Sequence, residues 1–131
     1  IPLKPGVKKF LGRLRNSGVR MCVATATDIE LTRSALKRLG VIDYFEDILT
    51  CGQAGMGKDN PVFFFRALEL IHTAVAETAV FEDSLYAIRT AKAAGFFIAG
   101  VYDESAREDA DEITALADIY LKDYDDWEMQ E

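Results

Sequence analysis

The chain has 131 residues, half of them hydrophobic, and its 22 acidic and 15 basic side chains give a net charge of -7 at pH 7. This length and apolar content predict a single domain over residues 1–131 with one hydrophobic core. The negative charge argues against nucleic acid and anionic membranes as partners, and no apolar stretch reaches the roughly twenty residues of a membrane-spanning helix. Cys22 and Cys51 lie in apolar stretches without metal-ligand spacing, so we expect reduced thiols in a cytoplasmic protein.

The spacing of apolar residues predicts helices and strands in regular alternation. In chain order we expect a helix over 7–14, a strand over 19–24, a helix over 31–39, a strand over 47–50, a loop over 51–60, a helix over 61–71, a strand over 78–81, a helix over 85–92, a strand over 96–102, a helix over 105–116 and a strand over 119–121. Asp28 is expected to cap the second helix, Pro61 to lie in the first turn of the third, and Ser105 to begin a capping box. The first strand is apolar on both sides, which is typical of a strand buried on both faces.

Strands joined by helices through short loops predict an α/β fold. The expected architecture is a doubly wound, Rossmann-like parallel sheet with helices on both faces, three layers in all. We expect the acidic segment 123–131 to be a solvated end held by Trp127. In open parallel sheets ligands bind beyond the carboxyl ends of the strands, so the residues that follow each strand are the candidates for function.

Polar residues follow three of the predicted strands. The first strand is followed by hydroxyls and backbone N–H groups that suit a phosphate oxygen, and the second by a glycine-containing loop whose lysine can neutralise an anion. The third ends in two adjacent carboxylates, hard oxygen ligands that favour Mg²⁺. Together these groups predict a site for a phosphoryl group and its metal ion. The candidate residues are Thr25, Ala26, Thr27, Lys58, Glu82 and Asp83.

Each of these residues also has a common structural role. A threonine after a strand often caps a helix, a single lysine is most often solvated, and acids are favoured at the N-terminus of any helix. Residues 52–58 match the G-x-x-x-x-G-K pattern of a nucleotide-binding loop, but Asp59 follows where that loop needs serine or threonine. His72, the only histidine, is expected on the surface.

Five short motifs follow one another along the chain: Pro5-Gly6-Val7, Val23-Ala24-Thr25, Gly57-Lys58 with Pro61, Val80-Phe81-Glu82-Asp83-Ser84, and Ala91-Lys92-Ala93-Ala94-Gly95. In combination they closely resemble the haloacid dehalogenase superfamily, and within it the branch of beta-phosphoglucomutase and phosphoglycolate phosphatase. The resemblance covers roughly residues 5–102. It implies that Thr25 holds a phosphoryl oxygen and that Lys58 stabilises the transferring group. It also implies that Asp83 binds Mg²⁺, with Glu82 assisting directly or through water.

The sequence departs from the family pattern at the nucleophile. Members of the family begin with a strand ending in Asp-x-Asp, whose first aspartate attacks phosphorus to form an aspartyl-phosphate, and an inserted helical cap then selects the substrate. The resemblance implies a parent phosphatase for a small phosphorylated metabolite. Because neither segment precedes Ile1, we expect this chain to be inactive alone. The alternatives are a phosphomutase of the beta-phosphoglucomutase type and a non-catalytic relative that binds phosphorylated ligands. The carboxylate pair argues against true dehalogenation, and the order threonine, lysine, acid argues against a receiver domain.

The same resemblance implies that the Asp-x-Asp strand lies between the strands over 19–24 and 78–81. An empty slot there would leave buried backbone groups unpaired at about 1–3 kcal/mol each, against a total stability of about 5–15 kcal/mol. We therefore expect the two flanking strands to pair directly, which gives the strand order 2-1-3-4-5. The alternative is a slot filled by a strand from a second copy, and hence self-association.

Overall fold

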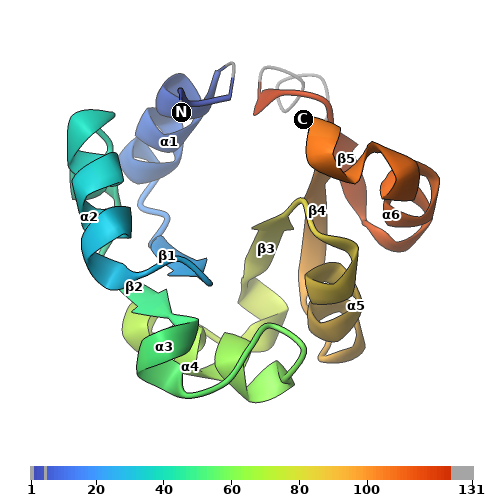
Figure 1. Cartoon of the computed structure of the whole chain (residues 1–131). Coiled ribbons are helices and arrows are strands. Elements are labelled where there is room, and N and C mark those ends of the chain that lie inside the picture. Colours follow the sequence, from blue (N-terminus) through green and yellow to red (C-terminus); the bar gives the residue numbers. More distant parts are fainter. Residues whose placement is uncertain (1, 5, 125–131) are drawn as a thin grey trace.

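Helices and strands alternate along the chain in the computed structural model, which describes residues 2–4 and 6–124 (Figure 1). The elements are α1 (Val7–Asn16), β1 (Cys22–Thr25), α2 (Ile29–Arg38), η1 (Ile42–Tyr44), β2 (Asp47–Thr50), α3 (Cys51–Ala54), α4 (Pro61–Ile71), η2 (Val75–Glu77), β3 (Ala79–Glu82), α5 (Leu85–Ala93), β4 (Phe97–Val101), η3 (Glu104–Asp109), α6 (Ala110–Leu116) and β5 (Ile119–Leu121), where η marks a 3-10 helix. The predicted α/β fold is confirmed. None of the helices in these residues is long and apolar enough to cross a membrane.

Two helices start where the sequence predicts. The Asp28 carboxylate accepts hydrogen bonds from the backbone N–H groups of Glu30 and Leu31 and so caps α2. Pro61 is the first residue of α4. A backbone N–H at this position has no partner within the helix, so the N–H that proline lacks costs no hydrogen bond. Both helix starts depend on residues close in sequence, which explains why the amino-acid sequence predicts them.

Two other local predictions are wrong. Residues 51–54 form the short helix α3 instead of a loop, because Thr50 and Gln53 exchange hydrogen bonds in a reciprocal capping box. The helix predicted from Ser105 begins later, as α6. The Asp103 carboxylate accepts a hydrogen bond from the Ser105 N–H and starts the irregular η3 there instead.

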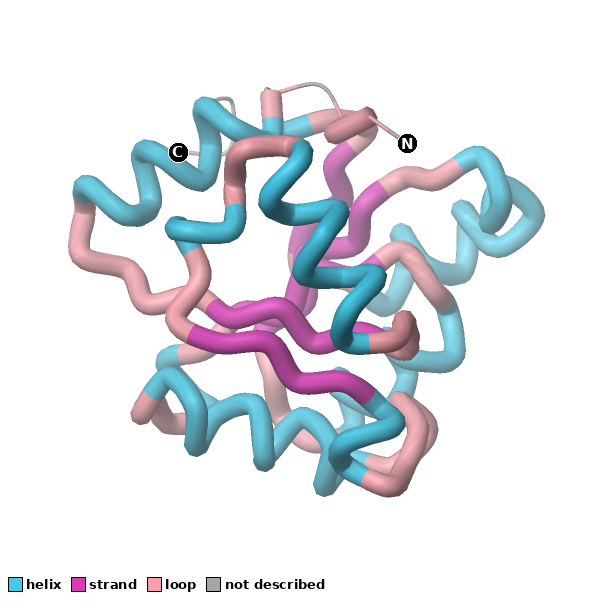
Figure 2. The backbone as a smooth tube through the Cα atoms, turned by 60° about the vertical axis from the view of Figure 1, so that its left-hand side comes forward, coloured by secondary structure: helices cyan, strands magenta, loops and turns pink. Residues whose placement is uncertain are grey.

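The five strands form two parallel sheets. β1 pairs with β2 in one sheet, and β3, β4 and β5 pair in that order in the other. Helices cover both faces, as expected (Figure 2). β1 and β3 do not pair, so the prediction that they close the sheet is wrong. They border a cavity that we call the inter-sheet groove, with Cys22 and Ala24 on one side and residues 79–82 on the other.

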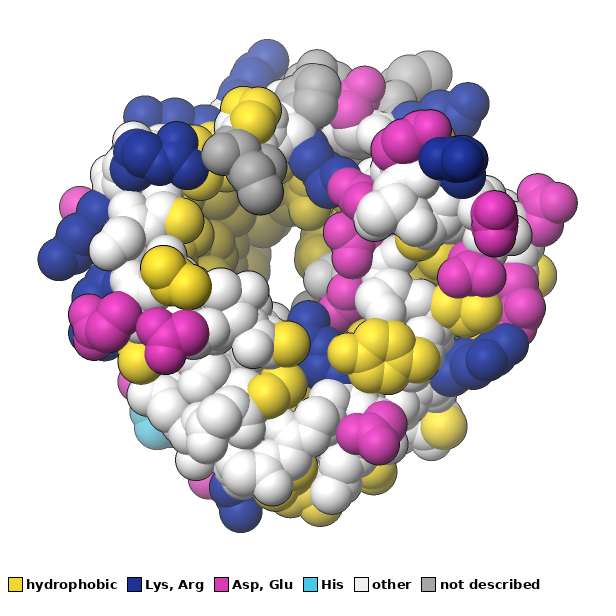
Figure 3. Space-filling model, in the orientation of Figure 1, with side chains coloured by type: hydrophobic (Ala, Val, Ile, Leu, Met, Phe, Trp, Pro, Cys, Tyr) yellow, Lys and Arg dark blue, Asp and Glu magenta, His cyan; other side chains and the backbone are white. Residues whose placement is uncertain are grey.

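The strands that border the groove keep contact with water. The predicted cost of buried, unpaired backbone groups, which favoured direct pairing of β1 with β3, therefore does not apply. All four residues of β1 are half-buried and Ala79 of β3 is exposed, whereas the last four residues of β4 are buried. The space-filling view is hollowed at its centre (Figure 3). Backbone groups that water can reach do not carry the cost of buried unpaired ones. The expectation that the first strand is buried on both faces is therefore wrong as well.

Two hydrophobic clusters form the core. The larger groups buried side chains of α4, α5, β4 and α6, and the smaller consists of Leu11, Met21 and Val41 with α1 and α2 around them. Helix α4 packs against β1 and β2 of one sheet and against α5, which covers the other. This helix therefore joins the two sheets where no strand does.

The start of the C-terminal segment is packed onto the fold. The Tyr124 ring lies 5.2 Å from that of Phe10 in α1 and 6.1 Å from that of Phe81 in β3, between ring centroids. Burial raises the pKa of the Tyr124 hydroxyl to about 12. The expectation of a solvated end over 123–131 is thus wrong at Tyr124, and Trp127 lies outside the described residues.

Candidate active site

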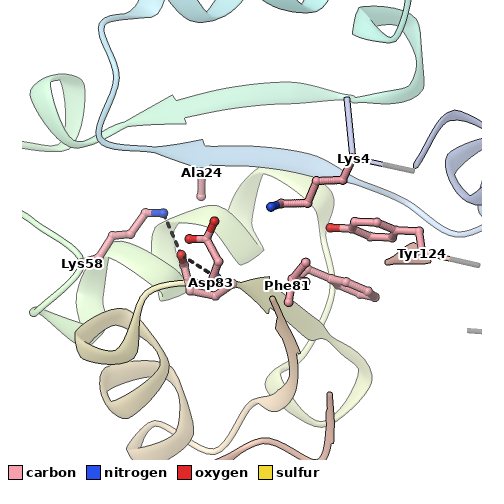
Figure 4. A pocket seen from close by; sticks show the side chains of 8 residues that line it. Lys4, Ala24, Lys58, Phe81, Asp83 and Tyr124 are labelled. Atoms are coloured by element: carbon pink, nitrogen blue, oxygen red, sulfur yellow. Dashed lines mark hydrogen bonds and ion pairs between the residues drawn. The ribbon is translucent and has the colours of Figure 1, made fainter. Parts of the chain in front are cut away.

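A small pocket opens at the carboxyl ends of β1, β3 and β4 (Figure 4). Its volume is about 160 Å³, and its lining includes Lys4, Ala24, Lys58, Glu82, Asp83 and Tyr124. Carboxyl ends of parallel strands are the usual location of ligand sites in open α/β sheets. Three of the six candidate residues, Lys58, Glu82 and Asp83, are brought together here.

Lys58 and Glu82 form a largely buried ion pair in this pocket. The Lys58 ammonium lies 2.8 Å from Glu82 Oε2, and the two side chains are 14% and 9% exposed. Glu82 Oε1 accepts hydrogen bonds from the backbone N–H groups of Asp83 and Ser84 at 3.1 and 3.2 Å. Both oxygens of the Glu82 carboxylate thus accept hydrogen bonds. The carboxylate fixes the ammonium of Lys58, which lies in the loop after α3, beyond β2 of the other sheet.

The Asp83 carboxylate is half-buried and points into the pocket (Figure 4). Burial raises its pKa, and the adjacent negative charge and contact of Glu82 and the charge of Asp103 raise it further. The Lys4 ammonium acts in the opposite direction. Because its charged form is destabilised in this way, the Asp83 carboxylate is stabilised when a cation binds beside it.

Lys4 also lines the pocket, although no sequence pattern predicts it there. Its ammonium donates hydrogen bonds to Asp103 Oδ1 at 2.7 Å and to the Tyr102 carbonyl at 3.0 Å. This contact with Lys4, together with Ser105, lowers the pKa of Asp103 to about 2. Because Lys4 and Tyr102 are 98 residues apart, no local pattern in the sequence signals their contact.

Thr25, the last residue of β1, and the two residues after it do not line the pocket. The Thr25 hydroxyl accepts a hydrogen bond from the Thr27 backbone N–H at 3.1 Å, and Ala26 and Thr27 are exposed. A hydroxyl that accepts one hydrogen bond can still donate its own proton. Thr25 directly follows Ala24, which does line the pocket.

The carboxylate pair can supply part of a magnesium site. Within residues 2–4 and 6–124, no group of three or more His, Cys, Asp or Glu side chains is placed to hold a metal ion. Mg²⁺ often binds through one or two carboxylates and completes its shell with water and substrate phosphate, so the pair fits this ion. Asp83 is the better ligand, since both Glu82 oxygens already accept hydrogen bonds.

Known proteins resemble this chain in sequence and in structure. A family model of haloacid dehalogenase-like hydrolases matches residues 1–95. The chain is 30% identical over 118 residues to validoxylamine A 7'-phosphate phosphatase of Streptomyces hygroscopicus subsp. limoneus, covering 90% of this chain and 54% of that protein. It is 30% identical over 99 residues to beta-phosphoglucomutase of Bacillus subtilis (strain 168), covering 76% and 43%.

The fold of a solved relative agrees over almost the whole chain. A HAD phosphatase from Thermococcus onnurineus superposes with a TM-score of 0.84 at 22% identity, covering 98% of this chain and 57% of that one. The chain thus spans about half the length of the relatives it matches. The family match over residues 1–95 includes Thr25, Lys58 and the Glu82–Asp83 pair.

Proposed function

The chain belongs to the family of haloacid dehalogenase-like hydrolases, and on that premise we propose that its pocket serves magnesium-dependent phosphoryl transfer in a phosphatase for a small phosphorylated metabolite. The observation that carries the proposal is the Lys58–Glu82 ion pair, 2.8 Å long, beside the Asp83 carboxylate in one pocket. Phosphoryl transfer depends mainly on positioning and on neutralising charge, which these groups suit. The names of the phosphatase and mutase relatives support a phosphorylated small molecule as substrate.

Each candidate residue has a distinct part in this proposal. Lys58, held in place by Glu82, neutralises an oxygen of the transferring phosphoryl group. The Thr25 hydroxyl donates its proton to a second phosphoryl oxygen while it accepts the Thr27 N–H, and the backbone N–H group of Ala26 follows it in the chain.

Asp83 holds the magnesium ion in this proposal, and Glu82 assists through water while it positions Lys58. When bound, Mg²⁺ supplies charge neutralisation at the phosphoryl oxygens. The raised pKa of Asp83 supports this role, since the cation replaces the proton that the buried carboxylate would otherwise favour.

We propose that the attacking carboxylate, which forms an aspartyl-phosphate, is carried by residues other than those of this chain. The alternative function is a phosphomutase, which the 30% identity to beta-phosphoglucomutase favours. We also propose a cytoplasmic location, supported by the two free cysteines, Cys22 and Cys51.

Magnesium binding to the chain tests the proposed metal site. Isothermal titration calorimetry with Mg²⁺ is expected to detect binding that Asp83→Asn weakens by about 10- to 100-fold. Asp43→Asn makes the same change of charge at an exposed position outside the pocket and is the matched control. Equal Mg²⁺ affinity in both variants would contradict the assignment of Asp83.

Turnover tests the proposed source of the nucleophile. The chain alone is expected to hydrolyse aryl phosphates with Mg²⁺ no faster than buffer does, since it lacks the attacking carboxylate. Metal-dependent hydrolysis by the chain that disappears in Asp83→Asn would contradict this part of the proposal. A chain that binds Mg²⁺ but stays inactive when joined to a strand ending in Asp-x-Asp would be a non-catalytic relative.

A further inference from the structure

The pocket at Asp83 has a second polar side, formed by Lys4 and Tyr124, which the proposed phosphoryl transfer leaves unused. Figure 4 shows Lys58 on one side of the Asp83 carboxylate and the tip of Lys4 on the other. The Tyr124 hydroxyl lies on the same side as Lys4 (Figure 4). All four side chains line one cavity of about 160 Å³, so a ligand in it meets polar groups on both sides of Asp83.

The Lys4 ammonium is held in place and keeps a donor for a ligand. It donates hydrogen bonds to Asp103 Oδ1 at 2.7 Å and to the Tyr102 carbonyl at 3.0 Å. An ammonium has three N–H donors, so within the described part of the chain one donor of Lys4 has no protein acceptor. A cation fixed in this way loses little further freedom when an anion binds to it.

The Tyr124 hydroxyl is a second donor on this side. Among residues 2–4 and 6–124 it has no hydrogen-bond partner, and no fully buried side-chain polar atom of these residues lacks one. The hydroxyl therefore reaches solvent, at a residue that lines the pocket. Burial and the charges of Asp83 and Glu82 raise its pKa to about 12, so it stays protonated and can donate a hydrogen bond at neutral pH.

These two donors determine the kind of ligand atom that fits beside them. Two donors that face one cavity suit an acceptor, and the positive charge of Lys4 favours an anionic oxygen. The charge of Lys4 acts on Asp83, and that of Asp83 acts on Tyr124, so both donors lie near the proposed metal ligand. The Asp83 carboxylate repels an anion until Mg²⁺ is bound, so the fitting ligand is an oxyanion that binds together with the metal.

We propose that Lys4 and Tyr124 form a second phosphoryl-binding subsite, in which the Lys4 ammonium and the Tyr124 hydroxyl donate hydrogen bonds to oxygens of the phosphoryl group on the side opposite Lys58. This inference rests on the proposed function, since it takes the phosphoryl group of the substrate as the ligand. The two lysines hold the group from opposite sides, Lys58 from the loop after α3 and Lys4 from the segment before α1. Asp103 is a positioning residue that acts through Lys4.

Binding of inorganic phosphate in the presence of Mg²⁺ tests the subsite. A titration followed by phosphorus NMR is expected to show binding to the parent chain that Lys4→Met weakens about 10- to 100-fold. Tyr124→Phe removes only the hydroxyl and should weaken binding about tenfold. Lys8→Met makes the same change of charge as Lys4→Met at an exposed position of α1 outside the pocket and should bind phosphate as the parent does.

Three results of this titration overturn the proposal. They are no phosphate binding by the parent chain, equal phosphate affinity in Lys4→Met and Lys8→Met, and unchanged affinity in Tyr124→Phe.

A purely structural role for Lys4 predicts a different pattern. If the Lys4–Asp103 pair served only to hold residues 2–4 on the loop after β4, breaking it from either side would have the same effect on phosphate binding. Asp103→Asn breaks the ion pair but keeps the ammonium, so its phosphate affinity is expected to stay within about fivefold of the parent. The two side chains are 34% and 32% exposed, so both variants are expected to fold. Equal losses in Lys4→Met and Asp103→Asn overturn the subsite.

The affinity for Mg²⁺, measured by calorimetry without phosphate, distinguishes this inference from the proposed metal site. Lys4→Met removes a cation near Asp83, so Mg²⁺ should bind this variant at least as tightly as the parent. Equal falls of phosphate and Mg²⁺ affinity in Lys4→Met overturn the subsite, because Lys4 would then act through the metal. If Asp83→Asn leaves Mg²⁺ affinity unchanged while Lys4→Met weakens phosphate binding, the metal assignment fails and the subsite stands.

Discussion

Glu82 receives three hydrogen bonds at the end of β3, from the Lys58 ammonium and from two backbone N–H groups. A carboxylate that is 9% exposed is costly to keep charged unless such partners surround it. The ion pair therefore fixes the position of Lys58 rather than adding much net stability. This role differs from that of the exposed ion pairs elsewhere on the surface, which are worth about 0–1 kcal/mol.

Removing the Lys58 charge is expected to destabilise the fold. Lys58→Met leaves the buried Glu82 carboxylate without its cation and should lower the free energy of unfolding by about 3 kcal/mol, measured by urea denaturation. The double variant Lys58→Met with Glu82→Gln should recover most of this loss, because glutamine keeps an acceptor for the backbone N–H groups. Lys92→Met breaks the exposed pair with Asp118 and is the control, with a loss of about 0–1 kcal/mol. Equal losses for the two single variants would contradict the buried pair.

Asp83 is expected to reduce stability at neutral pH in the absence of metal. Its pKa in the folded chain is raised above the ordinary value of 3.8, so its contribution to stability is present below pH 3.8 and is lost as the pH rises through the folded pKa. Asp83→Asn should therefore melt at a higher temperature than the parent at pH 7, with the difference shrinking toward pH 4. Thermal unfolding across this range, with exposed Asp43→Asn as the control, measures the effect. A less stable Asp83→Asn at pH 7 would contradict it.

At the scale of elements, Gly100 sets how closely α6 packs on β4. A Cβ atom at this position would lie 2.9 Å from Ile113 Cγ2 and 3.2 Å from Ala117 Cβ. Gly100→Ala is thus expected to lower the free energy of unfolding by about 1–3 kcal/mol through overpacking. Gly12 in α1 is the contrast, since its nearest contact would be an ordinary 3.7 Å from the Tyr44 hydroxyl. Gly12→Ala should raise stability by about 0.5–1 kcal/mol, and chemical denaturation that reverses this order would contradict the packing.

The elements were predictable where their signals are local. The strands over 47–50 and 119–121 have the predicted bounds, because short apolar runs between turn residues determine them. Helix α3 was not predictable from periodicity, since four residues complete only one turn. The start predicted for the helix α6 was wrong because Asp103, which the sequence analysis did not name as a cap, accepts the Ser105 N–H and begins the irregular η3 instead.

At the scale of the whole molecule, the predicted order 2-1-3-4-5 agrees with the pairing within each sheet, but the predicted pairing of β1 with β3 is wrong. Pairing of β1 with β3 was predicted from the cost of burying unpaired strand edges, whereas all four residues of β1 are half-buried and so remain in contact with water. Lys58, Glu82 and Asp83 could be predicted to meet, because parallel strands bring their carboxyl ends together. Lys4 and Tyr124 could not, since long-range packing alone brings the two ends of the chain to this pocket.

Phosphatase turnover tests the central proposal, that Asp83 and Lys58 serve magnesium-dependent phosphoryl transfer. The measurement is Mg²⁺-dependent hydrolysis of an aryl phosphate by this chain joined to a strand that ends in Asp-x-Asp. The account predicts hydrolysis that Asp83→Asn lowers by about 10²- to 10³-fold, as expected for the loss of one electrostatic stabiliser, and that Asp43→Asn leaves unchanged. Hydrolysis that persists without Mg²⁺, or that proceeds equally in both variants, would contradict it.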